Sequence, residues 1–246
     1  MAKNKEFKVP GGRQPFYNLF KVIMRLIFRR PKVINLAGDI EKTSIVVSNH
    51  SAKSGPPSLD LYFPVKCAKW GAHEMFEGYK SRVAYLRDIL AIKKCGKKPG
   101  FMTSFKAYLM AIFNPGIYKG MWMMPTYPDM RLGKTIKNSI KVLEANKPVM
   151  VFPENSNNGY KEVLTEFFPG FVMLAQQYVK TTGKDIPIYP VYYSVKKHIM
   201  AIDKPLYVKQ FIDQGLSREQ IAEIYKDKVN DLYFKYVENE PIYKGK

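Results

Sequence analysis

The chain has 246 residues, of which 46% are apolar and 14% are aromatic. This composition excludes an intrinsically disordered protein, and the length suffices for one large domain or two small ones. The 40 Lys and Arg residues outnumber the 21 Asp and Glu residues, and the net charge of +19 predicts an anionic partner: a membrane surface, a nucleic acid or a polyanionic small molecule.

The two cysteines, Cys67 and Cys95, lie in no metal-binding or redox spacing, so we predict free thiols in a reducing, cytosolic compartment and no metal site. The basic N-terminal segment lacks the long apolar stretch and cleavage site of a signal peptide. The most apolar region, residues 107–128, is interrupted by Lys119, glycines and prolines, so no membrane-spanning segment is expected.

The first predicted element is an amphipathic helix at residues 15–30, ended by Pro31. Its apolar residues recur every three or four positions, and basic residues accompany them. Such a helix suits the interface of an anionic membrane, and we treat residues 1–35 as a basic docking segment. The alternative is a helix that packs on its own domain, which is the common case for amphipathic helices.

Strands and helices then alternate along the chain. Apolar runs predict strands at residues 44–47, 120–124, 148–152 and 186–193, with a hairpin-like segment at 198–208. Helical patterns cover residues 79–92, 103–113, 132–146 and 170–181, and a last helix begins at Ser217 with Gln220 completing a capping box. This order predicts a single α/β domain over residues 36–246, with a central, partly parallel sheet flanked by helices.

Polar turns follow three of the predicted strands. Val47 leads into Ser48-Asn49-His50, Phe152 leads into a turn that begins Pro153-Glu154, and Met124 leads into Pro125-Thr126-Tyr127. Ligands of open α/β sheets bind beyond the carboxyl ends of the strands. We therefore expect His50 and Glu154 to share a site.

His50 is the leading candidate for a catalytic group. Histidine titrates near neutrality and suits the role of general base for a hydroxyl, provided that a carboxylate orients it. Asp60 can supply that carboxylate if the intervening loop folds back. The prolines after Gly55 favour a helix that opens there and would carry Asp60 near the loop.

Three motifs in this order resemble those of the glycerolipid (lysophospholipid) acyltransferase family. They are "SNHS", "VFPENS" and "IPIYPVYYS", and the resemblance covers residues 40–210. It implies that the histidine deprotonates a lipid or glycerol hydroxyl, which attacks an acyl thioester, while an aspartate orients the histidine and other motif residues bind the acceptor's phosphate. The positions that match are Asn49, His50, Phe152, Pro153, Glu154, Ser156, Pro187 and Pro190.

The chain also departs from the family pattern. Gly55 occupies the position of the aspartate, so the orienting carboxylate is either Asp60, displaced by an insertion, or Glu74. Asn155 and Asn157 replace the glycine and arginine of the third motif, and no arginine stands in the second. By the resemblance, the acceptor is expected to contact a further set of residues: Asn49, Lys53, Arg131, Glu154, Ser156 and Asn157, with Lys161 as another source of charge.

The resemblance implies a peripheral enzyme on the cytoplasmic face of the cell membrane, similar to 1-acylglycerol-3-phosphate acyltransferases. Its expected partners are anionic lipids, a lysophospholipid or glycerol-phosphate-type acceptor, and acyl-CoA or acyl carrier protein as co-substrate, with no cofactor. The alternative is a non-catalytic lipid-binding protein that keeps the fold, which the change at Gly55 favours. Nucleic-acid binding has only the charge in its favour, because the basic residues do not cluster on one element.

Overall fold

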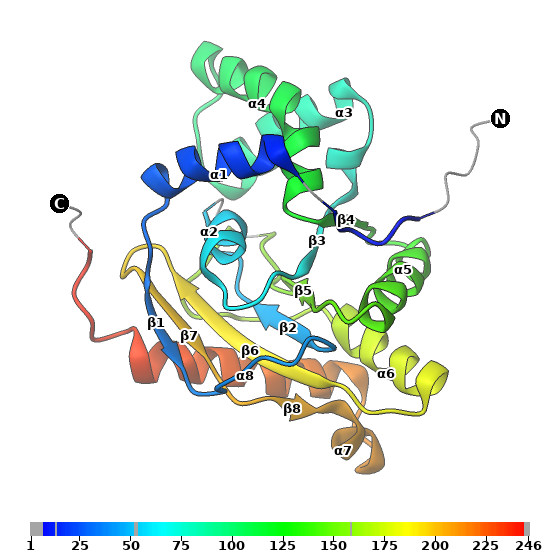
Figure 1. The fold of residues 1–246 in the computed structure, drawn as a ribbon. Coiled ribbons are helices and arrows are strands. Elements are labelled where there is room, and N and C mark those ends of the chain that lie inside the picture. The colour runs from blue at the N-terminus through cyan, green and yellow to red at the C-terminus, as the bar shows by residue number, and fades with distance from the viewer. Residues whose placement is uncertain (1–6, 13, 52–53, 158, 244–246) are drawn as a thin grey trace.

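The computed structural model describes residues 7–12, 14–51, 54–157 and 159–243, and its core is one mixed β-sheet (Figure 1). The strand order is β1-β7-β6-β2-β5-β3-β4, and β8 pairs with β6. Strands β6, β2, β5, β3 and β4 form a parallel block, whereas β7 and β8 run antiparallel to β6. The strands are β1 Lys32–Asn35, β2 Ile45–Ser48, β3 Ala68–Ala72, β4 Met123–Thr126, β5 Val149–Val151, β6 Pro187–Ser194, β7 Ile199–Ile202 and β8 Leu206–Tyr207.

Helices cover both faces of the sheet, as the alternation of strands and helices predicted. The bounds are α1 Pro15–Ile27, α2 Gly55–Tyr62, η1 His73–Phe76, α3 Tyr79–Ala84, η2 Tyr85–Lys94, α4 Phe101–Gly120, α5 Leu132–Glu144, α6 Gly170–Thr182, α7 Val208–Asp213 and α8 Arg218–Tyr236. Helices α5, α6 and α8 share one apolar core with the sheet. Helices α1, α3 and α4 gather at the opposite end of the molecule (Figure 1).

The central strand β2 shows why both faces are covered. Ile45 and Val47 belong to the core shared with α5, α6 and α8, whereas Val46 packs with Leu59 of α2 in a second core. All three side chains are fully buried. An uninterrupted apolar run is typical of a parallel strand with helices on both sides, and the strand ends at Ser48, after which Asn49 and His50 leave the sheet.

Several predicted elements differ from the structure. Strand β4 starts at Met123 and includes Pro125, which is tolerated because β4 is the edge strand. The helix expected at residues 79–92 is divided into α3 and the π-helix η2, and α4 is longer than its predicted range. Strands β7 and β8 both pair with β6, so they do not form a hairpin with each other. The predicted docking segment, residues 1–35, also supplies β1 to the sheet.

Helix α1 packs on α4 where two glycines, one turn apart, remove the side chains between the backbones. A Cβ atom added to Gly120 would lie 2.0 Å from Cγ of Tyr17, and one added to Gly116 would lie 3.0 Å from the ring of Phe16. The first distance is impossible for real atoms, so only glycine lets the Tyr17 ring lie against the α4 backbone. Tyr17 is thereby buried to 1% exposure.

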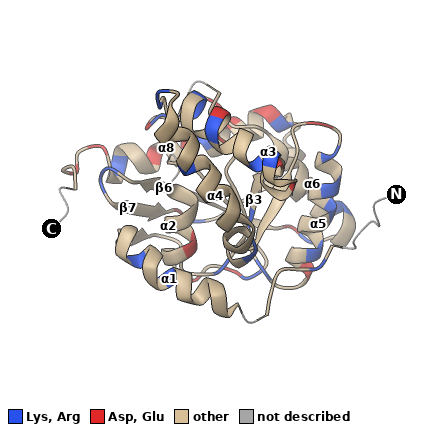
Figure 2. Ribbon diagram, turned by 90° about the horizontal axis from the view of Figure 1, so that it is seen from above, with Lys and Arg blue, Asp and Glu red and all other residues tan. Residues whose placement is uncertain are grey.

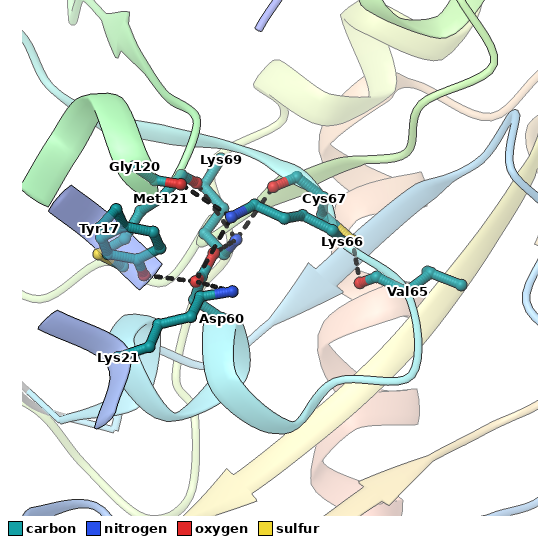
Figure 3. A network of polar contacts seen from close by, with 9 residues as sticks. All are labelled: Tyr17, Lys21, Asp60, Val65, Lys66, Cys67, Lys69, Gly120 and Met121. Atoms are coloured by element: carbon teal, nitrogen blue, oxygen red, sulfur yellow. Dashed lines mark hydrogen bonds and ion pairs between the residues drawn. The ribbon is translucent and has the colours of Figure 1, made fainter. Parts of the chain in front are cut away.

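A buried cluster of polar side chains joins α1, α2 and β3 (Figure 3). The Asp60 carboxylate accepts a hydrogen bond from the Tyr17 hydroxyl at 2.5 Å and one from Lys69 Nζ at 2.6 Å. Lys69 also donates to the carbonyl oxygen of Cys67 at 3.0 Å. Lys21 and Lys66 each lie 3.9 Å from the same carboxylate. We call these five charged or hydroxyl-bearing residues, Tyr17, Lys21, Asp60, Lys66 and Lys69, the Asp60 cluster.

The lysines keep Asp60 ionised in spite of its burial. Burial raises the pKa of the Asp60 carboxyl, but the charges of Lys69 and Lys66 and the hydrogen bonds from Lys69 and Tyr17 outweigh it and hold the pKa below its ordinary value of 3.8. Burial lowers the pKa of Lys66 to about 8, although Asp60 opposes that change. The side chains of Asp60 and Lys69 are 0% and 1% exposed, so each charge depends on the other for compensation.

Replacing Asp60 with Asn should therefore destabilise the fold strongly. The change keeps the shape of the side chain but removes the charge that compensates the Lys69 ammonium, so we expect the free energy of unfolding at neutral pH to fall by about 3–5 kcal/mol. Urea denaturation measures it. The control is Asp231→Asn, which breaks only an exposed ion pair with Lys228 at 4.0 Å and should change stability little.

Wild type and the Asp60→Asn variant also test the ionisation of Asp60. Its folded pKa lies below the unfolded value, so its stabilising contribution is complete above pH 3.8 and is lost as the pH falls through the folded pKa. The difference between wild type and Asp60→Asn should hence not shrink between neutral pH and about pH 4. A difference that already shrinks between about pH 6 and pH 5 would mean that burial, and not the lysines, controls this carboxyl.

Candidate active site

The structure brings His50 and Glu154 together at the carboxyl ends of two adjacent parallel strands. β2 pairs with β5, and the chain leaves both strands on the same edge of the sheet. The backbone N–H of His50 donates a hydrogen bond of 2.9 Å to Oε2 of Glu154. The convergence expected from the strand ends is thus present, and Glu154 fixes the backbone from which the imidazole projects.

The Asn49 side chain is buried and braces the end of β2 against β6. Its Nδ2 donates to the Tyr193 carbonyl at 2.9 Å, and its Oδ1 accepts from the Tyr193 N–H at 2.7 Å. The amide uses both of its ends in this pairing and is 2% exposed. Asn49 therefore holds the backbone just before His50 in place, and its contact with the acceptor stays a prediction.

The imidazole of His50 lies between two aromatic rings. Tyr160 stacks on it with centroids 4.9 Å apart and an interplanar angle of 21°, and Phe152 meets it edge-on at 5.3 Å. Both rings come from the segment that carries Glu154. Aromatic neighbours on two sides restrict the orientation of the imidazole, and the sequence offered no sign of this role for Tyr160.

Glu154 is a buried acid whose proton affinity is raised. Burial raises the pKa of its carboxyl, while hydrogen bonds from the N–H groups of His50 and Lys161 and the charge of Lys94 act in the opposite direction. The carboxylate lies between two backbone donors, so it ties the segment after β5 to the segment after β2. Raised pKa values of buried acids cluster at functional sites, which agrees with this position.

Lys94 is the cation at this site that sequence reasoning missed. It is the last residue of η2, and its Nζ donates a hydrogen bond of 2.8 Å to Oγ of Ser156 and lies 5.8 Å from the centroid of the Tyr160 ring. Burial lowers its pKa, which the nearby charges of Glu154 and Glu74 partly restore. Lys94 lies beyond the helix predicted at residues 79–92, but the π-helix η2 continues to it and turns its side chain inward.

The predicted carboxylates differ in their surroundings. Asp60 belongs to the buried cluster described above, where Tyr17 and Lys69 bind its two oxygens. Glu74 is the second residue of η1, and its Oε2 lies 3.2 Å from Nδ1 of His73. The contacts of Asp60 give it a structural role in the fold, and the role of either acid in orienting His50 stays a prediction.

The other predicted acceptor contacts are more peripheral. Arg131 is paired with Asp129 at 2.7 Å, with its side chain 54% exposed, and its guanidinium lies over the ring of Tyr127. Asn157 is exposed, and its N–H donates to Oδ1 of Asn155 within a turn. Lys53 lies outside the described residues. Among the described residues of the predicted set, Glu154 accepts from the His50 N–H and Ser156 accepts from Lys94.

Gly55, at the position where the family pattern has aspartate, cannot be replaced without moving the backbone. A Cβ atom at this position would lie 1.9 Å from the carbonyl oxygen of His50. The first residue of α2 thus packs directly on the backbone of His50. The backbone path from His50 into α2 therefore requires glycine at the position where the family pattern has aspartate.

Comparisons with known proteins identify the family and the fold of the chain. Residues 29–194 match the family model described as Acyltransferase, a range that includes both strand ends of the site. A search of solved structures found the crystal structure of the 1-acyl-sn-glycerophosphate (LPA) acyltransferase PlsC from Thermotoga maritima, with a TM-score of 0.50 and 14% sequence identity. That match covers 90% of this chain and 89% of the other. No curated protein sequence matched the chain.

The structural match shows the fold alone, since so few residues are identical. The family model spans two thirds of the sequence and contains His50, Glu154 and the strands that carry them. The chain belongs to the acyltransferase family.

Proposed function

We propose that this protein transfers a fatty acyl group from a thioester, acyl-CoA or acyl carrier protein, to the hydroxyl of a lysophospholipid or glycerol-phosphate-type acceptor at a membrane surface. The observation that carries the proposal is the placement of His50. Its imidazole projects from the carboxyl end of a central parallel strand, and Glu154 holds its backbone N–H, in a chain of the acyltransferase family.

His50 acts as the general base in the proposed reaction. The imidazole removes the proton of the acceptor hydroxyl while the oxygen attacks the thioester carbonyl. An ester C–O bond forms, the C–S bond breaks, and the imidazolium returns the proton to the departing thiolate. Backbone N–H groups of the site stabilise the oxyanion. The step requires neither a covalent acyl-enzyme nor a metal or resident cofactor.

The orientation of the imidazole has two proposed sources. Stacking on Tyr160 restricts the ring plane, and a carboxylate would select the tautomer. Asp60 and Glu74 are the two proposed acids. Glu74 is near enough to Lys94 for its charge to raise the pKa of that ammonium, whereas the Asp60 oxygens are bound by Tyr17 and Lys69.

Lys94 is the proposed partner of the acceptor's phosphate. It supplies a partly buried positive charge next to Ser156 and Tyr160, in a chain that lacks the arginine of the third motif at Asn157. A phosphate that reached Ser156 would meet an ammonium already held in position. Lysine binds as a point charge and does not give the two parallel hydrogen bonds of arginine.

The proposed membrane surface is the exposed apolar face formed by α1 and α4, which we call the α1–α4 face. Helices α1 and α4 cross the same end of the molecule, where Figure 2 draws them mostly in tan. None of the described helices combines the length and apolarity needed to cross a bilayer. The exposed apolar residues of this face are Phe16, Leu19, Val22, Ile23, Leu26, Ile27, Phe101, Met102, Phe105, Tyr108, Leu109, Met110, Ile112 and Phe113.

Basic side chains at the rim of the α1–α4 face favour anionic lipid. Arg25, Arg29 and Lys106 are exposed on or beside these helices, and each basic residue near such a surface contributes about 1 kcal/mol. We propose the cytoplasmic leaflet as the docking site, since Cys67 and Cys95 are free thiols suited to a reducing compartment.

Changing His50 to Gln should remove most of the acyl transfer. Loss of a general base reduces kcat by about a hundredfold to ten-thousandfold, and glutamine keeps a polar side chain between the two rings. Thioester consumption in the presence of lysophospholipid measures the effect. His198→Gln is the control, since this histidine stacks on Tyr243 in the turn between β6 and β7. A folded His50→Gln protein with wild-type turnover would contradict the assignment.

Changing Lys94 to Met should weaken binding of the phosphate-bearing acceptor and leave binding of the acyl donor unchanged. The alkyl stem stays, but a charge-assisted hydrogen bond of about 1.5–3 kcal/mol is lost, so KM for a lysophosphatidate should rise about ten- to a hundredfold. KM for acyl-CoA, and for a monoacylglycerol that lacks phosphate, should stay unchanged. Lys97→Met, on an exposed lysine three residues after Lys94, is the control. Equal effects on both acceptors would exclude Lys94 as the phosphate ligand.

The double change Leu26→Ser and Ile27→Ser should reduce binding to vesicles of phosphatidylcholine and phosphatidylglycerol. These residues are 79% and 68% exposed in α1, so the fold does not need them, and each contributes about 1.5–3 kcal/mol when buried in lipid. Co-sedimentation should show at least about a tenfold weaker affinity. Phe234→Ser, an exposed apolar residue of α8, is the matched control. Unchanged affinity of the double variant would exclude the α1–α4 face.

A further inference from the structure

Helix α1 is attached to the domain through few contacts. Among its described residues only Tyr17 and Met24 are buried, and they pack with Ile117 and Met121 in a small cluster of their own. The two large cores that the sheet shares with its helices contain no residue of α1 among their members. The position of α1 therefore depends on specific bonds more than on a broad apolar contact.

Two hydrogen bonds join α1 and the segment after it to α2. The Tyr17 hydroxyl, from the first turn of α1, donates to Oδ2 of Asp60 in α2 at 2.5 Å. The Tyr62 hydroxyl, from the end of α2, donates to the carbonyl oxygen of Phe28 just after α1. Because the two bonds involve opposite ends of α1, they fix both its position along α2 and its direction.

Helix α2 is in turn seated against the proposed general base. Its first residue, Gly55, approaches the His50 carbonyl so closely that no Cβ fits between them. On its other side, the N–H of His50 is bound by Glu154. A shift of α2 toward the sheet would thus press on the peptide group of His50, and a shift away would leave it supported by Glu154 alone.

The polar bonds that join α1, α2 and β3 are of a kind that selects one arrangement of the helices. A buried ion pair is weak evidence for stability, because well-packed apolar residues can replace it without loss, and its best-attested use is to select one arrangement of helices. The Asp60 cluster has that form. The charged pair Asp60–Lys69 is fixed on α2 and β3, and α1 reaches it through the hydrogen bond from the Tyr17 hydroxyl, with Lys21 of the same helix 3.9 Å from the carboxylate (Figure 3).

We propose that Tyr17 is a positioning residue for acyl transfer: through Asp60 and α2 it sets the backbone of His50 according to how α1 is seated on a lipid surface. Helix α1 carries one half of the α1–α4 face, so lipid contact acts on the element that Tyr17 ties to the active site. The inference rests on the proposed function. It adds that docking on lipid changes kcat of the bound enzyme, and does not act only by raising the concentration of the enzyme at the membrane.

The test compares Tyr17→Phe with Tyr225→Phe. Both changes remove a hydroxyl from a buried tyrosine, and the Tyr225 hydroxyl donates to the Leu206 carbonyl at 3.1 Å, within the core on the other face of the sheet. Tyr62→Phe, which removes the second bond to the α1 region, is measured alongside. Each protein is assayed as the full chain, bound to vesicles of phosphatidylcholine and phosphatidylglycerol, well below its melting temperature.

For Tyr17→Phe we expect kcat to fall by about ten- to a hundredfold, the effect of a small misplacement of a catalytic group, with KM for both substrates and vesicle affinity unchanged. Hydrogen exchange of the His50 amide should become faster in the vesicle-bound variant. Tyr225→Phe should leave kcat and that exchange rate as in wild type. Should Tyr17→Phe fail to fold, Tyr62→Phe is expected to show the same separation of kcat from KM.

Wild-type kcat in a folded, vesicle-bound Tyr17→Phe protein would overturn the proposal, as would equal losses in Tyr17→Phe and Tyr225→Phe. Hydrogen exchange separates this failure from a failure of the proposed function. If wild type transfers no acyl group, faster exchange at His50 in Tyr17→Phe would still support the connection. Unchanged exchange would contradict it.

Discussion

The ion pair between Asp60 and Lys69 is the constraint on which the packing of α1 and α2 against β3 depends. Both side chains are withdrawn from water, so each charge is tolerable only while the other stays within hydrogen-bond distance. That requirement fixes α2 against β3. Helix α1 then joins the same carboxylate through Tyr17 and lies on α4 where Gly120 leaves room for the ring. One carboxylate thus determines how three elements distant in sequence are arranged around the segment that carries His50.

The proposed site follows from two features of the parallel sheet. The carboxyl ends of β2 and β5 bring two polar turns together, and Glu154 uses its buried carboxylate to hold the N–H of His50. Rings from the second turn then confine the imidazole. Positive charge arrives from a different element, the π-helix η2, whose Lys94 reaches Ser156. The family assignment and this geometry together support acyl transfer, and the preference for an acceptor that carries a phosphate is proposed to depend on Lys94.

The sequence predicted those parts of the site that depend on local pattern. The uninterrupted apolar run of β2 and the polar residues after it gave the strand, its burial and the nearness of His50 to Glu154, since parallel strands end on one edge. Strand β3 was missed because Lys69 and Gly71 interrupt its apolar pattern, and only the buried partner Asp60 explains a lysine there. The sequence does not show that Asp60 is bound by Tyr17, because the two residues lie 43 positions apart, and the role of Asp60 in orienting His50 stays a prediction. The predicted helix at residues 79–92 stops short of Lys94, because a helical period of 3.6 residues cannot reveal a π-helix.

Because Gly55 replaces the aspartate of the family pattern, the central claim to test is that the protein is an enzyme and not a lipid-binding protein of the same fold. The most direct measurement is mass spectrometry of the lipids after vesicle-bound wild-type protein has been incubated with acyl-CoA or acyl carrier protein and a panel of lysophospholipids. The account predicts a diacyl product, formed in preference from acceptors that carry a phosphomonoester. Vesicle binding without diacyl product from any acceptor and either donor would contradict it, and would assign the fold to lipid binding alone.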